Sequence, residues 1–253
     1  MSTFSSCNQS SMLHGWSTAD PMLLSADEWQ ALRLSLEVAL WSLLWNLPVA
    51  TAVAWLLVRR RFPGRALLDA FAHLPLVLPP VLTGYLLLVL FGARGPIGGW
   101  LQRVFGIHLI FTTAGTVLAV AVMTFPLMVR AIRLTLEGID AGLEEAARTL
   151  GAGPVDRFFS ITLPLMLPGI LAGAVTAFAA GLGEFGAVIT FVSNIPGITR
   201  TLPLALYTAL QTPNGDATAA RLAIISFTLG LVGLVLSEWL SRTLRRQLGR
   251  GIA

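Results

Sequence analysis

The chain has 253 residues, of which 55% are hydrophobic and 12% charged, and its mean hydropathy is +0.76. Soluble domains carry about 25% charged residues, so the composition indicates an integral membrane protein with several helices. All basic residues are arginine, which excludes a Walker-type phosphate loop and a Schiff-base enzyme, because both need a lysine. The net charge is +4, but the arginines lie beside apolar segments and form no groove-reading cluster, so no nucleic-acid partner is expected.

The first 21 residues are polar and rich in serine, and they lack the basic start and apolar core of a signal peptide. They predict either a disordered extension over 1–21 or a start codon assigned upstream of Met22. Cys7 is the single cysteine and no lipoprotein-type apolar run precedes it, so no disulfide or lipid anchor is expected there.

Residues 22–253 are predicted to form one all-α membrane domain with about five transmembrane helices. The five long apolar stretches are 32–58, 67–91, 113–132, 165–192 and 218–240. Each has about 20 residues or more, enough to cross a hydrocarbon core of about 30 Å. Prolines within or near the stretches predict kinked helices around a pathway, because neighbouring helices or a cavity can satisfy the freed carbonyl groups. These prolines are Pro48, Pro75, Pro79, Pro80, Pro126 and Pro168.

The arginines predict the orientation of the chain. With the N-terminus outside and the C-terminus in the cytoplasm (N-out, C-in), twelve arginines lie in or beside cytoplasmic segments and five lie outside. This bias is typical of cytoplasmic loops. The cytoplasmic set is Arg59, Arg60, Arg61, Arg65, Arg130, Arg133, Arg148, Arg157, Arg242, Arg245, Arg246 and Arg250. The outer set is Arg33, Arg94, Arg103, Arg200 and Arg221.

The polar segment 137–164 is then cytoplasmic, and its pattern predicts a helix–turn–helix. Four apolar residues recur at helical spacing and form one face. They are Leu143, Ala146, Ala147 and Leu150. Glu144 and Arg148 stand four residues apart on the other side. Gly151 is placed to end the first helix, and Pro154 suits the first turn of a second one.

Aromatic side chains of the second helix, Phe158 and Phe159, are available to a partner in this interpretation. The alternative is a pair of interfacial helices that pack on lipid headgroups. The helical pattern alone does not separate the two.

One string in this segment resembles the cytoplasmic loop of ABC-importer permeases. It reads Glu145-Ala-Ala, three residues, Gly151, nine residues, then Ile161-Thr-Leu-Pro164. The resemblance implies that the loop docks on a separate ATP-hydrolysing subunit, so that ATP and Mg belong to that subunit and this chain is neither an enzyme nor a cofactor carrier. The implied docking residues are Glu144, Glu145, Ala146, Ala147, Gly151, Phe158, Phe159, Ile161, Leu163 and Pro164.

Longer strings resemble molybdate-transport permeases. They are Leu23–Ser35, Leu74–Pro80, Phe125–Arg130, Gly183–Gly186 and Ser193–Pro203. The resemblance implies a bacterial inner-membrane importer built from two copies of this chain, two cytoplasmic ATPase subunits and an external oxyanion-binding protein. Sulfate or tungstate permeases of the same class are the alternative. One departure is Ile198, where this subfamily is expected to have an acid that could pair with Arg200.

Two groups of residues are candidates for the pathway or its gate. Glu184, with Gly183 and Gly186 beside it, is the carboxylate well inside the fourth span, where a charge is costly unless it faces protein or water. A carboxylate repels a molybdate dianion, so a structural partner of an arginine or of backbone amides is favoured over a proton- or substrate-linked role. Close helix packing is the favoured explanation of the two glycines.

The second group is Thr199, Arg200 and Thr201, which precede a short helix whose free N-terminal amides suit an anion. The alternative is that Thr201 caps this helix and that Arg200 is solvated or contacts the binding protein. A transporter needs only weak binding along its path.

Two other functional classes are less well supported. A secondary transporter that uses Glu184 as a proton site predicts inverted repeats, which the five stretches do not show. A membrane enzyme needs a nucleophile and a base, and no such constellation is present. His14, His73 and His108 are widely spaced and no Cys/His cluster exists, so no metal site is expected.

Overall fold

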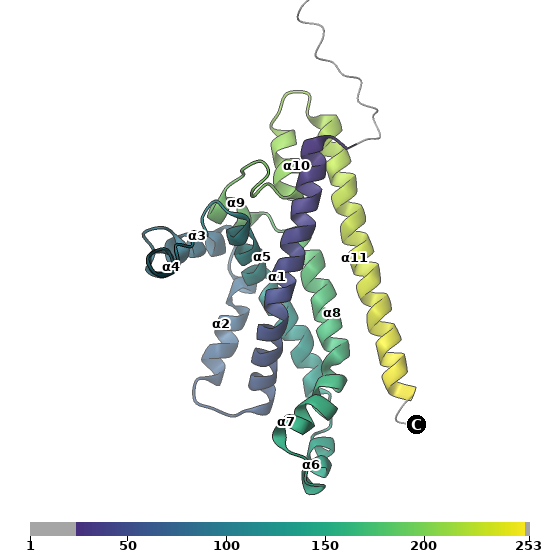
Figure 1. Ribbon diagram of the computed structural model, residues 1–253. Coiled ribbons are helices and arrows are strands. Elements are labelled where there is room, and N and C mark those ends of the chain that lie inside the picture. Colours follow the sequence, from purple (N-terminus) through teal and green to yellow (C-terminus); the bar gives the residue numbers. More distant parts are fainter. Residues whose placement is uncertain (1–23, 251–253) are drawn as a thin grey trace, which may run out of the picture.

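The computed structural model describes residues 24–250, and this part of the chain folds into helices without a strand (Figure 1). Four of its helices are long and apolar enough to cross a membrane, or five if one bent pair counts as a span. The four long helices are α1 (Ala26–Arg59), α5 (Thr113–Glu137), α8 (Leu163–Leu182) and α11 (Asp216–Arg250). The predicted all-α membrane fold is therefore confirmed. The predictions for 1–21, including Cys7, and for His14 lie outside the described residues.

The predicted second span, 67–91, is broken near its prolines and is not one continuous helix. It is a pair, α2 (Arg65–Val77) and α3 (Pro80–Phe91), whose axes are bent by 119°. Leu78 between them is extended, with φ −77° and ψ 144°. A residue before proline disfavours the helical conformation, and a proline offers no N–H to continue the ladder. Pro79 therefore ends α2, and Pro80 starts a new helix in another direction.

The predicted fourth span, 165–192, is also interrupted. Helix α8 ends at Leu182, and the short helix α9 (Gly186–Val192) begins after three residues that include Glu184. The predicted stretches 32–58, 113–132 and 218–240 lie inside α1, α5 and α11, which extend beyond them.

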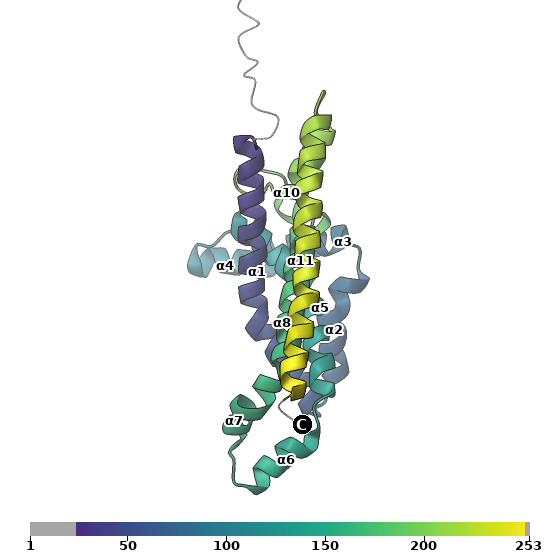
Figure 2. The same cartoon turned by 90° about the vertical axis from the view of Figure 1, so that its right-hand side faces the viewer.

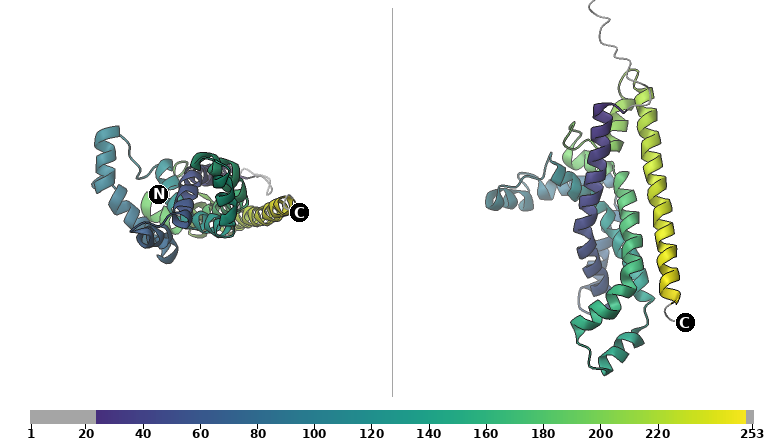
Figure 3. Two further views of the ribbon diagram at one scale, coloured as in Figure 1. Left: turned by 90° about the horizontal axis from the view of Figure 1, so that it is seen from below. Right: turned by 45° about the vertical axis from the view of Figure 1, so that its right-hand side comes forward.

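The segment between α5 and α8 projects from the end of the bundle at which α11 also ends (Figure 2). It contains α6 (Ala141–Thr149), α7 (Pro154–Arg157) and the π-helical turn η2 (Phe158–Thr162), which continues into α8. The opposite end holds the start of α1 and α10 (Leu202–Leu210). Seen from below, α4 (Pro96–Phe105) and α11 lie on opposite sides of the bundle (Figure 3).

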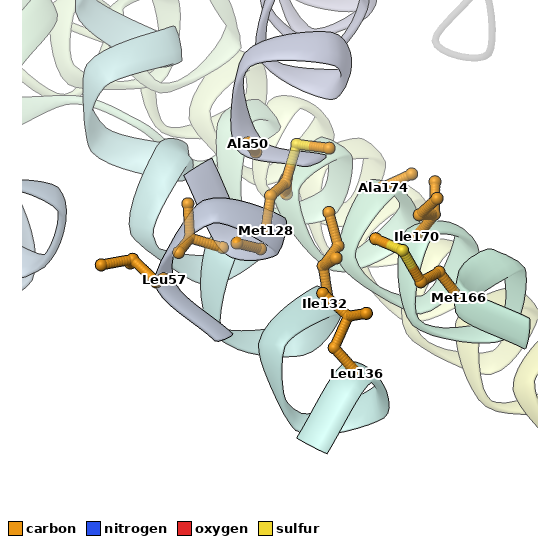
Figure 4. Close-up of a cluster of buried hydrophobic side chains, with 11 residues drawn as sticks. Ala50, Leu57, Met128, Ile132, Leu136, Met166, Ile170 and Ala174 are labelled. Carbon is orange, nitrogen blue, oxygen red and sulfur yellow. The ribbon is translucent and has the colours of Figure 1, made fainter. Parts of the chain in front are cut away.

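The main apolar core joins α1, α5 and α8 near the end that carries α6 and α7. Met128 and Ile132 of α5 are fully buried there against Leu57 of α1 and Met166 of α8 (Figure 4). A second core joins α3, α5, α9 and α10 to α1 and includes the fully buried Phe191. A third core joins α10 and α11 to α1 and includes Leu202 and Leu222.

Small residues bring α8 close to α5. A Cβ placed on Gly173 would lie 3.2 Å from Ala131 Cβ, and one on Gly169 would overlap Thr135. Gly169 and Gly173 thus form a small-xxx-small pair that lets α8 approach α5 closely.

Two buried polar contacts fix α1 in the bundle. Asn46 donates through Nδ2 to Ala121 O at 2.7 Å and to Thr124 Oγ1 at 3.1 Å, both on α5. At the N-terminal end of α1, Glu28 is 3% exposed and accepts from Arg221 of α11 at 3.0 Å. Such paired polar groups hold helices together where apolar side chains alone give little specificity.

Candidate functional site

Helix α6 is a separate, well-capped helix. At its start, Asp140 accepts from the Gly142 amide at 2.8 Å. At its end, Gly151 has φ +88°, and the Ala152 amide donates to Ala147 O at 3.0 Å while the Gly151 amide donates to Arg148 O. This hydrogen-bond pair is a Schellman turn, for which glycine is favoured because positive φ costs it least. Gly151 therefore ends the helix as predicted from its position.

The apolar face of α6 and α7 is uncovered in this chain. Leu150 is 89% exposed, Val155 68% and Phe159 61%. Leu143 is also exposed. Large apolar side chains gathered on one projecting segment mark a surface that another protein or a membrane covers. Of the other predicted docking residues, Glu145, Ala146 and Pro164 are exposed and Ala147 is half-buried, whereas the side chain of Glu144 lies outside the described part.

Phe158 differs from its neighbour Phe159, because it packs inside the chain. Its ring meets Trp55 of α1 edge-on at 5.9 Å between centroids. The guanidinium group of Arg60 lies 5.6 Å from the Trp55 ring, a cation–π distance. Phe158 therefore joins the projecting segment to α1, and its half-buried ring is less accessible than that of the exposed Phe159. Trp55 was not among the predicted site residues. Its position near the predicted cytoplasmic end of the first span could have indicated a contact with the segment 137–164.

Ile161 and Leu163 are less exposed than most of the described residues of α6. Both are half-buried, and Leu163 packs against the core of α1, α5 and α8. The predicted docking set thus divides into residues that project and residues that anchor the segment.

Glu184 lies in the break between α8 and α9. Its Oε1 accepts from the Ala187 amide at 2.9 Å, so the carboxylate caps the first turn of α9. A carboxylate at this position satisfies an orphan N–H group and complements the helix dipole. Of the roles predicted for Glu184, the structure shows the hydrogen bond to a backbone amide.

The glycines beside Glu184 have unequal roles. A Cβ on Gly186 would lie 2.7 Å from Pro80 Cβ of α3, which is too close for a real side chain. A Cβ on Gly183 would meet its nearest atom at 3.7 Å, an ordinary contact. Close helix packing therefore explains why residue 186 is a glycine. It does not explain the glycine at position 183, where a side chain would have room.

The loop 193–201 is built around Thr199. This residue is fully buried, and its hydroxyl accepts from the Ile195 amide and donates to Ser193 O, each at 2.9 Å. Thr199 is therefore engaged inside the loop and not presented to an anion.

Arg200 has a neutral partner in place of the expected acid. Its Nε donates to Asn194 Oδ1 at 2.9 Å, and Asn194 Nδ2 in turn donates to Thr208 of α10 at 2.7 Å. Ile198, at the expected acidic position, uses its backbone carbonyl to accept from Thr113 of α5. Asn194 thus accepts the hydrogen bond from Arg200 for which a carboxylate at position 198 was expected.

The start of α10 is not a free anion site. The Leu202 amide donates to Ser35 Oγ of α1 at 2.7 Å, and the next residue is Pro203, which has no N–H. Thr201 precedes the helix, but its side chain makes no capping hydrogen bond and is 4% exposed. The Leu202 amide is therefore not free as predicted, and Thr201 does not cap the helix as predicted. The side chain of Ser35, 167 positions away in the sequence, accepts from this amide instead.

Replacing Ser35 by alanine is expected to destabilise the α1–α10 contact by about 0.5–2 kcal/mol, the usual cost of losing a cap. The measurement is the thermal unfolding midpoint of the detergent-solubilised protein. Ser42→Ala is the matched control, because Ser42 is equally buried but donates to Ala39 O of its own helix. Equal effects of the two substitutions would contradict the capping role.

A cavity of about 280 Å³ lies at the α10 end. Arg200, Asp27 and Glu28 line it together with Thr208 and Thr212. Glu28 is paired with Arg221, and Asp27 faces the same cavity as Arg200, so the cavity offers no surplus of positive charge for an oxyanion. Within residues 24–250, no group of three His, Cys, Asp or Glu side chains is placed to hold a metal ion.

Comparison with known proteins identifies the group of proteins to which this arrangement belongs. Residues 46–246 match the family model described as binding-protein-dependent transport system inner membrane component. The molybdenum transport system permease protein ModB of Escherichia coli K12 is 62% identical over 229 residues, which cover 90% of this chain and 100% of that protein. ModB of Haemophilus influenzae is 56% identical over 224 residues, covering 88% and 98%.

Among solved structures, a bacterial alginate ABC transporter in complex with an alginate pentasaccharide-bound periplasmic protein aligns with a TM-score of 0.69. The identity is 19%, and the alignment covers 87% of this chain and 80% of that one. At this identity the likeness shows a shared fold. From the family match and the two close relatives together, the chain belongs to the family of inner-membrane components of binding-protein-dependent transport systems and crosses that membrane several times.

Proposed function

We propose that this chain is the permease subunit of an ATP-driven importer that carries molybdate across the bacterial inner membrane. The identity to two molybdenum permeases over almost their whole length supports the cargo. The alternatives within the class are sulfate and tungstate, which are oxyanions of the same charge.

The observation that carries the proposal is the uncovered apolar face of α6 and α7. Leu143, Leu150 and Val155 project from the end of the bundle beside the exposed Glu145. The Glu145-Ala-Ala string occupies this face, and its partner is a cytoplasmic ATPase subunit. Lipid headgroups are a poorer partner, because Phe158 and the η2 turn hold the segment beyond the end of the bundle.

The complete importer contains two copies of this permease, two ATPase subunits that bind ATP and Mg, and a periplasmic oxyanion-binding protein. Nucleotide closes the ATPase subunits, and the docked α6–α7 segments follow. The helices then change which side of the pore is open. This coupling requires that nucleotide bind the two states with different affinity.

The orientation of the proposed permease is N-out, C-in, with α6 and α7 in the cytoplasm. The arginine-rich turn 59–65, the α6–α7 segment and the C-terminal end of α11 lie at one end of the bundle, which supports this orientation. An excess of arginine marks the cytoplasmic side.

In the proposed pathway, Glu184, Gly183 and Gly186 form part of the gate by shaping the break between α8 and α9. Thr199, Arg200 and Thr201 stiffen the loop that faces the binding protein. None of them needs to bind the anion tightly, because conduction requires sites that release as readily as they bind.

The test is reconstitution of the permease with its ATPase in proteoliposomes and addition of the loaded binding protein. We expect molybdate uptake that depends on ATP and on the ATPase subunit, with tungstate competing strongly and sulfate weakly. Preferential uptake of sulfate would contradict the cargo. Uptake driven by a proton gradient without the ATPase subunit would contradict the whole proposal.

A further inference from the structure

A cluster of charged side chains joins α2 to α5 near the α6 end of the bundle. Arg133 of α5 donates through Nη1 to both carboxylate oxygens of Asp69 of α2, each at 3.0 Å. The Nε of Arg133 donates to Glu137 of the same helix at 2.7 Å. His73 Nδ1 lies 2.9 Å from the backbone O of Asp69 and 3.1 Å from its Oδ1. A single guanidinium group therefore holds two helices, and two carboxylates surround it.

The cluster lies directly before the docking segment. Helix α5 runs on from Arg133 for one turn and ends at Glu137, and Asp140 then caps α6. A displacement of α6 can therefore act on the end of α5 through the short connection 138–140.

Helix α2 depends on α5 for its position. Among the described residues, α5 is the one helix on which α2 packs extensively. Ala72 is the buried residue of α2, and Leu68 reaches the core of α1, α5 and α8. The Asp69–Arg133 pair is the polar part of this narrow contact.

The far end of α2 leads to the candidate gate. After the bend at Leu78 comes α3, which lies against α9 so closely that a Cβ on Gly84 would be 2.6 Å from Ala187 O. Ala187 is also the residue whose amide Glu184 caps. Chain connections and contacts together thus link α6 to the break at Glu184: α6 follows α5 in the chain, Arg133 of α5 pairs with Asp69 of α2, and α2 leads through Leu78 to α3, which packs on α9.

We propose that Asp69 and Arg133 are positioning residues that make α2 move with the docking segment and so transmit its motion to the α3–α9 layer. This inference rests on the proposed function of the chain as an ATP-driven permease. Arg133 and Asp69 are half-buried, and ion pairs at such exposed positions contribute little to stability. Their loss is therefore expected to impair transport without unfolding the protein.

The experiment compares variants of the complete transporter in proteoliposomes. Asp69→Asn and Arg133→Gln are expected to keep ATP hydrolysis while molybdate uptake per ATP falls by about three- to thirty-fold, the range seen for residues that carry coupling. The charge-swapped double variant, Asp69→Arg with Arg133→Asp, is expected to restore most of the uptake. Glu137→Gln is the matched control, since it removes only the contact within α5, and it is expected to behave like the wild type.

A second measurement does not depend on the cargo. In a Cys7→Ser background, spin labels are placed at Phe71 of α2 and Arg148 of α6, both of which are exposed. The distance between the labels is expected to stay constant on addition of ATP in the otherwise wild-type complex and to change in Asp69→Asn.

The outcomes separate the two levels of inference. Unchanged uptake per ATP in both single variants, or a label distance that responds to ATP identically with and without Asp69, would overturn the positioning role. A parent complex that hydrolyses ATP but moves no molybdate would contradict the proposed cargo instead, and the label distances would still decide the role of Asp69 and Arg133.

Discussion

Reversing the charge of Glu145 is expected to detach the ATPase subunit while the membrane bundle stays folded. The side chain is exposed on α6, next to the uncovered Leu143 and Leu150, so the substitution Glu145→Arg disturbs no contact of the bundle. An unpaired charge at a desolvated interface costs about 2–5 kcal/mol, which corresponds to a loss of affinity of roughly thirty-fold or more. The measurement is the amount of ATPase that co-purifies with the tagged permease, together with uptake.

Asp216→Arg is the control for this substitution. Asp216 is exposed in the first turn of α11, at the opposite end of the bundle, and undergoes the same reversal of charge. It should leave the ATPase bound. Normal assembly and transport in the Glu145→Arg variant would refute the docking role of α6.

The substitution Gly84→Val is expected to be among the most damaging in the membrane domain. A Cβ at this position would lie 2.6 Å from Ala187 O and 2.9 Å from Ala187 Cα, which are backbone atoms that cannot rotate away. Overpacking of a well-packed core costs about 1–3 kcal/mol, and a collision with backbone belongs at the upper end. We expect a lower unfolding midpoint and loss of transport, because α3 must separate from α9 beside the Glu184 break.

Gly230→Ala is the matched control for the Gly84 variant. Gly230 lies in α11, and a Cβ there would meet nothing within 4 Å. Alanine in a helix is more stable than glycine by about 0.5–1 kcal/mol, so this variant should unfold at the same temperature or higher. A Gly84→Val protein as stable and active as this control would show that α3 and α9 are not held in close contact.

The long helices of the fold could be predicted because each is a continuous apolar run. Length and hydropathy were enough to place α1, α5 and α11. The direction of the chain after Pro79 could not be predicted, because proline chemistry implies a break but the 119° angle depends on the packing of α3 against α9.

The candidate site divides in the same way. The end of α6 at Gly151 followed from local chemistry, since a helix that stops before a glycine needs no tertiary partner. The predicted Thr201 cap was wrong, because Ser35 of α1 accepts from the Leu202 amide. The packing of Phe158 was not predicted, because its partner Trp55 also comes from α1, far away in the sequence. The Asp69–Arg133 pair was missed for the same reason, although each residue has a charged or titratable neighbour four positions on, His73 and Glu137.

The π-helical turn η2 (Phe158–Thr162) determines how α6 and α7 are rotated about the axis of α8. A π-helical turn holds one residue more than an α-helical turn, and each residue of an α-helix advances the chain by about 100° around its axis. Deleting one residue from this turn would join α7 to α8 as a regular helix and rotate α6 by about that angle around α8. The one additional residue of the π-helical turn therefore sets the direction in which the α6 face points around the axis of α8, and with it the neighbour that this face contacts.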